Sequence, residues 1–237
     1  MIDNVAGAQN VRFGVLLSAG GSAFIEAFEM VGGGASRFFV VTDRDCGAVA
    51  KAKAAGIDVE IIEDADRVSF SRRTAAALRN AGCRCAIMHF SRLVSADLFE
   101  TILTVNVHPA LLPAFPGLDG VGDAFKARSV FQGATLHVAD AGMDTGPVLA
   151  QAVHPVPAGA DLVWRHKLGF VQKAVVTALF FDWVRSGRVD CDTRGADAFD
   201  LDGLPVDAAL NPGFATNAIA KAADVLLNTV PPVGAQQ

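Results

Sequence analysis

The first half of the chain alternates short apolar runs with segments whose apolar residues recur at helical spacing. The apolar runs predict buried strands at residues 11–18, 38–43, 59–62, 85–90 and 104–108. The segments between them predict helices at residues 23–31, 46–56 and 71–82, the last with Ser71 as its N-cap. Such an alternation favours a Rossmann-like α/β fold, a mostly parallel open twisted sheet with helices on both faces.

The pattern changes after residue 117. Residues 133–140 and 146–156 read as two strands joined by a short turn, which predicts antiparallel strands near the C-terminal half. Residues 163–187 predict one long apolar-rich helix, and residues 218–229 a later one. From Asp190 onward Gly, Pro, Asp and Ala dominate. We therefore expect a main domain at residues 1–189 and a C-terminal extension or arm at 190–237 packed on it.

Composition and charge exclude several classes. The formal net charge of −5 gives no overall attraction to nucleic acid or to an anionic membrane. The four cysteines lack the spacing of a metal site, and buried packing is a common role for free cysteine. No apolar run reaches the ~18 residues of a membrane span, and residues 1–10 lack a signal-peptide pattern. We expect a cytoplasmic protein that binds neither nucleic acid nor membrane.

Polar side chains at predicted strand ends are the first candidates for chemistry. Open parallel sheets bind ligands at the carboxyl ends of their strands, where Ser18, Asp43 and His108 fall. Asn106 and His108 lie two residues apart, so a strand places both side chains on one face. Asn can donate to a developing oxyanion, and His can transfer protons near neutral pH. The alternative is a strand end that polar groups merely cap before a proline-rich loop.

A carboxylate beside His108 would orient the imidazole and favour its charged form. Asp144 lies in the stretch ADAGMDTGPV between the two later predicted strands, and Asp140 lies in the same stretch. The pattern does not rank the two, and an ordinary turn residue explains either one equally well.

Four stretches of the chain together resemble the folate-dependent formyltransferase family. They are VLLSAGGSAF (15–24), VVTDRDCGAVAKAKAAGI (40–57), VNVHPALLPAFPG (105–117) and GATLHVADAGMDTGPVLAQ (133–151). The pair NxHPxLLPxFPG and DxGxDTGP is highly specific, and the stretches occur in the family's order. The resemblance implies an enzyme that transfers a formyl group from the co-substrate 10-formyltetrahydrofolate to an amine, without a metal.

The resemblance also assigns residues to roles. The catalytic residues would be Asn106, His108 and Asp144, with Asn106 and a protonated His108 holding the oxyanion while Asp144 keeps His108 charged and orders a water. The cofactor side is expected at Arg72, Ser91, Arg92, Leu93, Val94, Asp140, Ala141 and Gly142. Arg73 rivals Arg72, and a solvated helix face is the alternative for both. The acceptor side is expected at Gly20, Gly21, Ser22, Pro109 and Lys173, where the glycine turn offers backbone donors for an anion.

The chain departs from the family on the acceptor side. Ala23 replaces the Asn that usually follows the phosphate loop, and no His follows the FPG stretch. Lys173 and Ala174 replace a Glu-His pair whose Glu contacts the substrate. The acceptor is therefore either glycinamide ribonucleotide, as in de novo purine synthesis, or a different small amine. The extension is a candidate contact for a homodimer.

Two further classes stay open. A deformylase that hydrolyses 10-formyltetrahydrofolate shares this core, but it usually carries an additional N-terminal domain, and only residues 1–10 precede the first predicted strand. A non-catalytic folate-binding relic is disfavoured because all three catalytic positions are intact. Formate release without an acceptor would identify the first class, and cofactor binding without turnover the second.

Overall fold

A single sheet organises the chain in the computed structural model, which describes residues 11–206 and 209–230. Within these residues, eight strands join in the order β3-β2-β1-β4-β5-β6-β7-β8. The strands are β1 (Arg12–Leu17), β2 (Phe38–Thr42), β3 (Asp58–Ile61), β4 (Cys83–His89), β5 (Leu103–His108), β6 (Phe131–Val138), β7 (Val148–Pro155) and β8 (Leu210–Asn211). The predictions for residues 1–10 and 231–237 lie outside the described residues.

The direction of the strands divides the sheet into two parts. Strands β1 to β5 pair in parallel, whereas β6, β7 and β8 pair antiparallel to their neighbours. The predicted mostly parallel sheet with antiparallel strands in the C-terminal half is therefore confirmed. β8 was not predicted, because two residues are too few for an apolar alternation to register.

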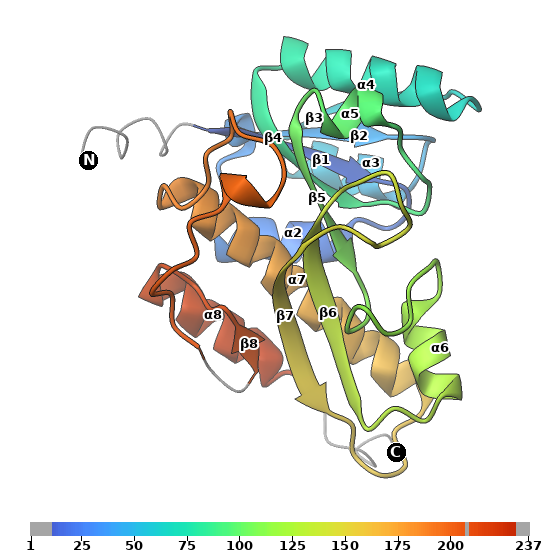
Figure 1. Ribbon diagram of the computed structural model, residues 1–237, viewed down its shortest axis with the longest axis vertical. Coiled ribbons are helices and arrows are strands. Elements are labelled where there is room, and N and C mark those ends of the chain that lie inside the picture. The colour runs from blue at the N-terminus through green and yellow to red at the C-terminus, as the bar shows by residue number, and fades with distance from the viewer. Residues whose placement is uncertain (1–10, 207–208, 231–237) are drawn as a thin grey trace.

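Helices cover both faces of the sheet. They are α2 (Ser22–Met30), α3 (Gly47–Ala54), α4 (Arg67–Asn80), α5 (Ala96–Phe99), α6 (Gly120–Lys126), α7 (Leu162–Arg185) and α8 (Asn217–Leu227), with short 3₁₀ turns η1 (Ala35–Arg37) and η2 (Ala196–Ala198). Figure 1 shows α4 and α5 on one side of the sheet and α2, α7 and α8 on the other. The short helices α5 and α6 were not predicted, because neither is long enough to show a helical period.

One predicted helix start is wrong. α4 begins at Arg67, and its N-cap is Asp66, whose carboxylate accepts the Ser69 N–H at 2.7 Å. Ser71 lies inside the helix instead. Its hydroxyl donates to the Arg67 carbonyl at 2.8 Å and accepts the Ser95 N–H at 2.8 Å. Asp66 caps because it precedes the first turn of the apolar pattern, and Ser71 anchors the loop before α5.

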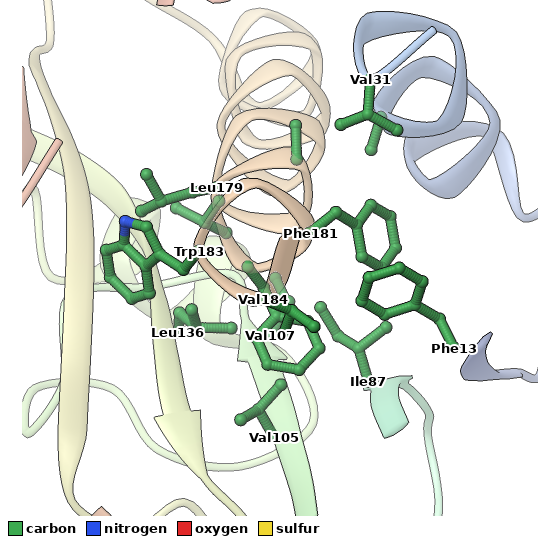
Figure 2. Close-up of a cluster of buried hydrophobic side chains, with 14 of the residues drawn as sticks. Phe13, Val31, Ile87, Val105, Val107, Leu136, Leu179, Phe181, Trp183 and Val184 are labelled. Atoms are coloured by element: carbon green, nitrogen blue, oxygen red, sulfur yellow. The ribbon is translucent and has the colours of Figure 1, made fainter. Parts of the chain in front are cut away.

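Side chains of the strands alternate between two hydrophobic layers. On β1, Phe13, Val15 and Leu17 join the layer under α2 and α7, whereas Leu16 joins the layer under α4. α7 is apolar around most of its circumference because the sheet covers one side of it and α2 and α8 cover the other. Figure 2 shows Phe181 of α7 against Phe13, with ring centroids 4.8 Å apart.

The described part of the C-terminal extension packs on this framework. The Trp183 indole N–H donates to the Gly213 carbonyl at 3.0 Å. The buried Asp182 carboxylate accepts the backbone N–H groups of Ala215 and Thr216 at 2.6 and 3.1 Å. Ile219 and Ala223 of α8 belong to the same core cluster as the sheet. The domain boundary after residue 189 and the homodimer stay predictions.

The strand order reverses next to β1, and this reversal positions the site. The chain runs outward from β1 to β2 and β3, returns to β4 on the other side of β1, and continues to β5. Such a reversal leaves a crevice at the carboxyl ends of the two central strands. Among the described helices, none has both the length and the hydropathy of a membrane span.

Candidate active site

Four polar side chains meet at the carboxyl end of β5, and we call Asn106, His108, His137 and Asp144 the polar cluster. Asn106 and His108 lie on the same face of β5, as their spacing predicts. The Asn106 amide N–H groups donate to His137 Nε2 at 3.1 Å and to Asp144 Oδ1 at 3.3 Å. His108 Nδ1 lies 3.2 Å from Asp144 Oδ2. The loop carrying Asp144 therefore closes on the two residues that the strand presents.

The backbone of Asp144 has φ +56°, in the left-handed region that Asp tolerates better than most residues. This turn aims the carboxylate back at β5, where Oδ2 also accepts the Gly117 N–H at 2.8 Å. Burial alone would raise the pKa of Asp144. The nearby His137, the hydrogen bond from the Gly117 N–H and the nearby His108 together outweigh burial and lower this pKa, so Asp144 is a carboxylate at neutral pH.

Asp140, the rival carboxylate, does a different job. It accepts the Gly142 N–H at 3.1 Å and the Thr145 hydroxyl at 2.9 and 3.0 Å. These bonds shape the loop that leads to Asp144. The structure thus brings Asp144 to His108 and gives Asp140 a supporting position.

His137 is the member of the polar cluster that sequence reasoning missed. It lies on β6 directly opposite Asn106 in the antiparallel register. Its Nδ1 faces the Val138 carbonyl at 3.0 Å, so Nδ1 carries the proton and Nε2 is left to accept from Asn106. The sequence signal was a single titratable residue inside the strand-like run GATLHVAD, but its apolar neighbours Leu136 and Val138 are equally typical of a core histidine.

His108 is almost fully enclosed, with 2% of its surface exposed. Its Nε2 donates to the Phe115 carbonyl at 2.7 Å, and Phe115 holds φ +56°, an uncommon value for a bulky residue. A Cβ at Gly120 would lie 2.8 Å from the same nitrogen, so the start of α6 needs glycine to pack there. The loop after β5 therefore fixes one side of the ring and leaves Nδ1 toward Asp144.

Burial and neighbouring groups act on the charge of His108 in opposite directions. Burial lowers the pKa of His108, and Asp144 and the Phe115 carbonyl raise it only in part. Burial thus shifts the imidazole toward its neutral form, and the protonated ring that the family resemblance implies stays a prediction. Removal from water is the physical reason, because the charged form loses more solvation than the neutral one.

A cleft surrounds the polar cluster. Its walls come from β4, β5, the 140–144 loop and α7. The predicted residues that line it are Ser91, Arg92, Leu93, Val94, Asn106, His108, Pro109, Asp140, Gly142, Asp144 and Lys173. Arg92 is fixed at its edge, since its guanidinium lies 4.0 Å from the Phe70 ring centroid and donates to the Asp64 carbonyl at 3.0 Å. Ser18 and Ser91 join across the cleft floor through their hydroxyls at 2.8 Å.

Three predicted cofactor-side residues lie elsewhere. Arg72 pairs with Asp97 at 3.3 Å and Arg73 with Asp64 at 3.2 Å, both on the exposed side of α4. Ala141 is exposed in the 140–144 loop but does not line the cleft. Their roles stay predictions.

A second cavity adjoins the cleft, and we call it the side pocket. It is lined by the loop 20–22, the first turn of α2, His89, Phe170 and Lys173. Gly21 holds φ +66° at the N-cap of α2, and a Cβ there would lie 2.8 Å from Ala48 Cβ. Lys51 of α3, which sequence reasoning missed, reaches this loop and donates to the Gly20 carbonyl at 2.9 Å and to the Ser22 hydroxyl. The side pocket therefore combines a helix N-terminus with a lysine, a combination suited to anions.

Lys173 and His89 stand between the cleft and the side pocket, and both residues line both cavities. Burial lowers the pKa of Lys173. Burial, reinforced by the nearby Lys173, lowers the pKa of His89 to about 3, so this imidazole is neutral at physiological pH. His89 Nε2 lies 2.8 Å from the Thr177 hydroxyl, one turn after Lys173 on α7. Among the described residues, no group of three or more His, Cys, Asp or Glu side chains is arranged to hold a metal ion.

Comparison with known proteins places this geometry in a family. A phosphoribosylglycinamide formyltransferase of Mycobacterium tuberculosis is 39% identical over 128 residues, which cover 52% of this chain and 60% of the relative. One from Bacillus subtilis is 47% identical over 68 residues, or 28% of this chain and 35% of the relative. The chain thus matches less than two thirds of the length of these relatives.

Solved structures agree on the fold. The glycinamide ribonucleotide transformylase 1 of Symbiobacterium toebii superposes with a TM-score of 0.69 at 26% identity, covering 77% of this chain and 91% of its own. The phosphoribosylglycinamide formyltransferase of Brucella melitensis gives 0.64 at 26% identity, covering 74% and 96%. The family model described as formyl transferase matches residues 11–164. Because this match spans more than half of the chain and includes the polar cluster, the protein belongs to the formyl transferase family.

Proposed function

We propose that this protein transfers a formyl group from 10-formyltetrahydrofolate to a primary amine. The observation that carries the proposal is the polar cluster itself: an amide, an imidazole and a carboxylate converge at the head of one cleft in a member of the formyl transferase family. Formyl transfer is acyl transfer, and acyl transfer needs donors for an oxyanion and a group that moves one proton.

The reaction follows from the atoms of the polar cluster. The amine lone pair attacks the formyl carbon, and a new C–N bond forms while the carbonyl π electrons move onto oxygen. The amine gives one proton to His108 Nδ1. This nitrogen carries no proton in the neutral ring, because the ring proton lies on Nε2 and is donated to the Phe115 carbonyl. The imidazolium then returns that proton to N10 of the folate as the C–N10 bond breaks. The products are an N-formyl amine and tetrahydrofolate, and no oxidant or metal enters the balance.

Electrostatics favours this order of events. His108 is biased toward neutrality by burial, and negative charge forming on the carbonyl oxygen raises the affinity of Nδ1 for the proton. Asp144, 3.2 Å away, stabilises the resulting imidazolium. Asn106 supplies the second donor by giving up its longer bond, the 3.3 Å contact to Asp144. A donor of this kind is worth about 3–4 kcal/mol in the transition state.

The cofactor side of the proposal rests on the part of the cleft formed by the 91–94 and 140–144 loops. Leu93 and Met143 are exposed apolar side chains on these two loops, and both line the cleft. Apolar walls with a few fixed polar groups suit the flat ring system of a folate. Arg92 and Asp140 frame these walls, held by their own hydrogen bonds.

Two acceptors compete. The relatives are named for phosphoribosylglycinamide, and the side pocket, with Gly20, Gly21 and Ser22 at the α2 N-terminus, suits the phosphate of such a substrate. Lys173 favours a different amine, because a cation there repels an acceptor that is still an ammonium. Glycinamide ribonucleotide is the first acceptor to test.

The test is a spectroscopic turnover assay with a 10-formyl-5,8-dideazafolate donor. Transfer to glycinamide ribonucleotide would support both the reaction and the acceptor. Transfer to other amines only would support the reaction with a different acceptor. Formate release without any amine would overturn the proposal in favour of a hydrolase, and donor binding without turnover would indicate a folate-binding relic.

A further inference from the structure

Lys173 is a cation placed at the boundary between the chemistry and the side pocket. It projects from α7 and lines the cleft with Asn106, His108 and Asp144, and it also lines the side pocket. Within residues 11–206 and 209–230, its ammonium group makes no hydrogen bond and no salt bridge, and burial lowers its pKa. A half-buried ammonium without a partner has lost part of its hydration without compensation, which favours an anionic ligand.

The loop 20–22 does not supply that partner, because it has a cation of its own. Lys51 donates to Gly20 and Ser22, and its ammonium is the nearest cation to Gly20. A phosphate at the α2 N-terminus would therefore be balanced by Lys51. The charge of Lys173 is left for a second anionic group, nearer to the polar cluster.

His89 completes this arrangement as a hydrogen-bond acceptor. The Thr177 hydroxyl donates its single proton to the Lys173 carbonyl at 2.6 Å, a bond from residue i to i−4 inside the helix. The hydroxyl can then only accept from His89, so the His89 proton is on Nε2. Nδ1 is left with a lone pair, on a residue that lines both cavities together with Lys173.

We propose that Lys173 and His89 form a subsite for an acceptor that carries a carboxylate next to its amine. The Lys173 ammonium pairs with the carboxylate, and His89 Nδ1 accepts an N–H of the amine, which directs the nitrogen lone pair toward the cleft. The acceptor class is therefore an amino acid or an amine with an adjacent acid, with or without a distant phosphate. This assignment rests on the proposed formyl transfer for its purpose, but its binding test does not.

The subsite would discriminate by leaving a charge unpaired. A carboxylate and a carboxamide have nearly the same shape, but only the carboxylate neutralises Lys173. Binding the amide would cover the ammonium without a counter-charge, and sites built for a partner reject analogues that lack it. We expect at least about 10-fold tighter binding of the acid than of its amide.

The experiment measures binding to the full-length protein by calorimetry, without turnover. The probes are matched pairs that differ only in the acid: glycine with glycinamide, alanine with alaninamide and aspartate with asparagine, together with inorganic phosphate. The variants are Lys173→Met, which removes the charge, and Lys173→Arg, which keeps it. Lys167→Met is the matched control, since Lys167 is an exposed lysine on the same helix.

The wild type and Lys167→Met should prefer the acid of a pair, Lys173→Met should lose the preference, and Lys173→Arg should retain most of it. Equal binding of acids and amides by the wild type would overturn the subsite. So would a loss confined to inorganic phosphate in Lys173→Met, because Lys173 would then serve the loop 20–22. Lys173-dependent acid binding without any formyl transfer would leave the subsite standing and refute the proposed function. If the wild type showed no acid preference, and if Lys173→Met still transferred the formyl group to glycinamide ribonucleotide at the wild-type rate, the proposed function would stand and the subsite would be refuted.

Discussion

The two ends of the cleft differ in how completely their polar groups are satisfied. In the polar cluster, each side chain is held by other groups: Asn106 by His137 and Asp144, His108 by the Phe115 carbonyl, and Asp144 by Asn106 and Gly117. At the other end, the Lys173 ammonium has no hydrogen-bond or salt-bridge partner among the described residues, and His89 uses one ring nitrogen.

This difference separates two tasks. Atoms that must meet a transition state gain from being fixed beforehand, because no reorganisation is then needed during the reaction. Atoms that must recognise a substrate keep free donors, acceptors and charge for it, at a cost in stability before it binds. Groups with the first task are hydrogen-bonded to one another within the protein. Groups with the second task, such as the Lys173 ammonium, lack a partner until a substrate binds.

Among substitutions in the polar cluster, His108→Ala should have the largest effect. We expect the rate of formyl transfer to fall by at least about 1,000-fold, since the substitution removes both the oxyanion donor and the proton carrier. Binding of the dideazafolate donor should stay within about 3-fold, because the folate walls lie on other residues. Single-turnover kinetics and donor titration measure the two quantities, and a variant that retained most of its rate would refute the assigned chemistry.

The next test separates the two carboxylates of the 140–144 loop. Asp144→Asn keeps the shape but removes the charge facing His108, so we expect a rate loss of about 100-fold. Asp140→Asn is the matched control, since Asp140 only bonds Gly142 and Thr145, and its loss should be within about 5-fold. Equal losses in both variants would mean that the carboxylates act through loop shape alone.

The sequence predicted the fold well because its apolar strands carry a strong and simple period. The parallel strands, the antiparallel pair and α7 follow from apolar runs of the expected lengths, although β3 at the edge of the sheet is mostly exposed. Asn106 and His108 share a face because strand geometry requires it, and the family motif named Asp144. The start of α4 was predicted wrongly, and the short elements α5, α6 and β8 were not predicted. A cap, a short helix and a two-residue strand each contain too few residues to show a period in the sequence.

The residues that sequence reasoning missed share a different cause. His137 reaches Asn106 through the register of β5 and β6, and Lys51 reaches Gly20 from a separate helix. His89 meets Thr177 from β4 to α7. Each contact joins positions more than twenty residues apart, and a single sequence carries no signal for which distant side chains meet. The lowered pKa of His108 depends on burial by the same distant elements.

A third test addresses the loop 20–22 of the side pocket. Lys51→Met removes the cation that supports the α2 N-terminus, so the KM for a phosphorylated acceptor should rise by about 10-fold with little change in kcat. The effect should shrink at high salt, because Lys51 is exposed and its charge is screened. Lys53→Met, an exposed lysine on the same helix, should leave KM unchanged. A kcat loss without a KM change would place Lys51 in the chemistry instead.

The smallest effect concerns the proton that His89 lacks. Its pKa is about 3 in the folded protein and about 6.5 when unfolded, so the unfolded chain binds the proton more readily between these values. The free energy of unfolding should therefore fall as the pH drops below 6.5, by about 1 kcal/mol between pH 6.5 and 5.5 from this residue alone. Denaturant unfolding of the wild type and of His89→Gln isolates the contribution. Glutamine does not titrate and can still bond Thr177, while other titrating groups, including His108, contribute equally to both proteins and cancel. Parallel pH profiles for the two proteins would mean that His89 keeps its ordinary pKa and is hydrated rather than enclosed beside Lys173.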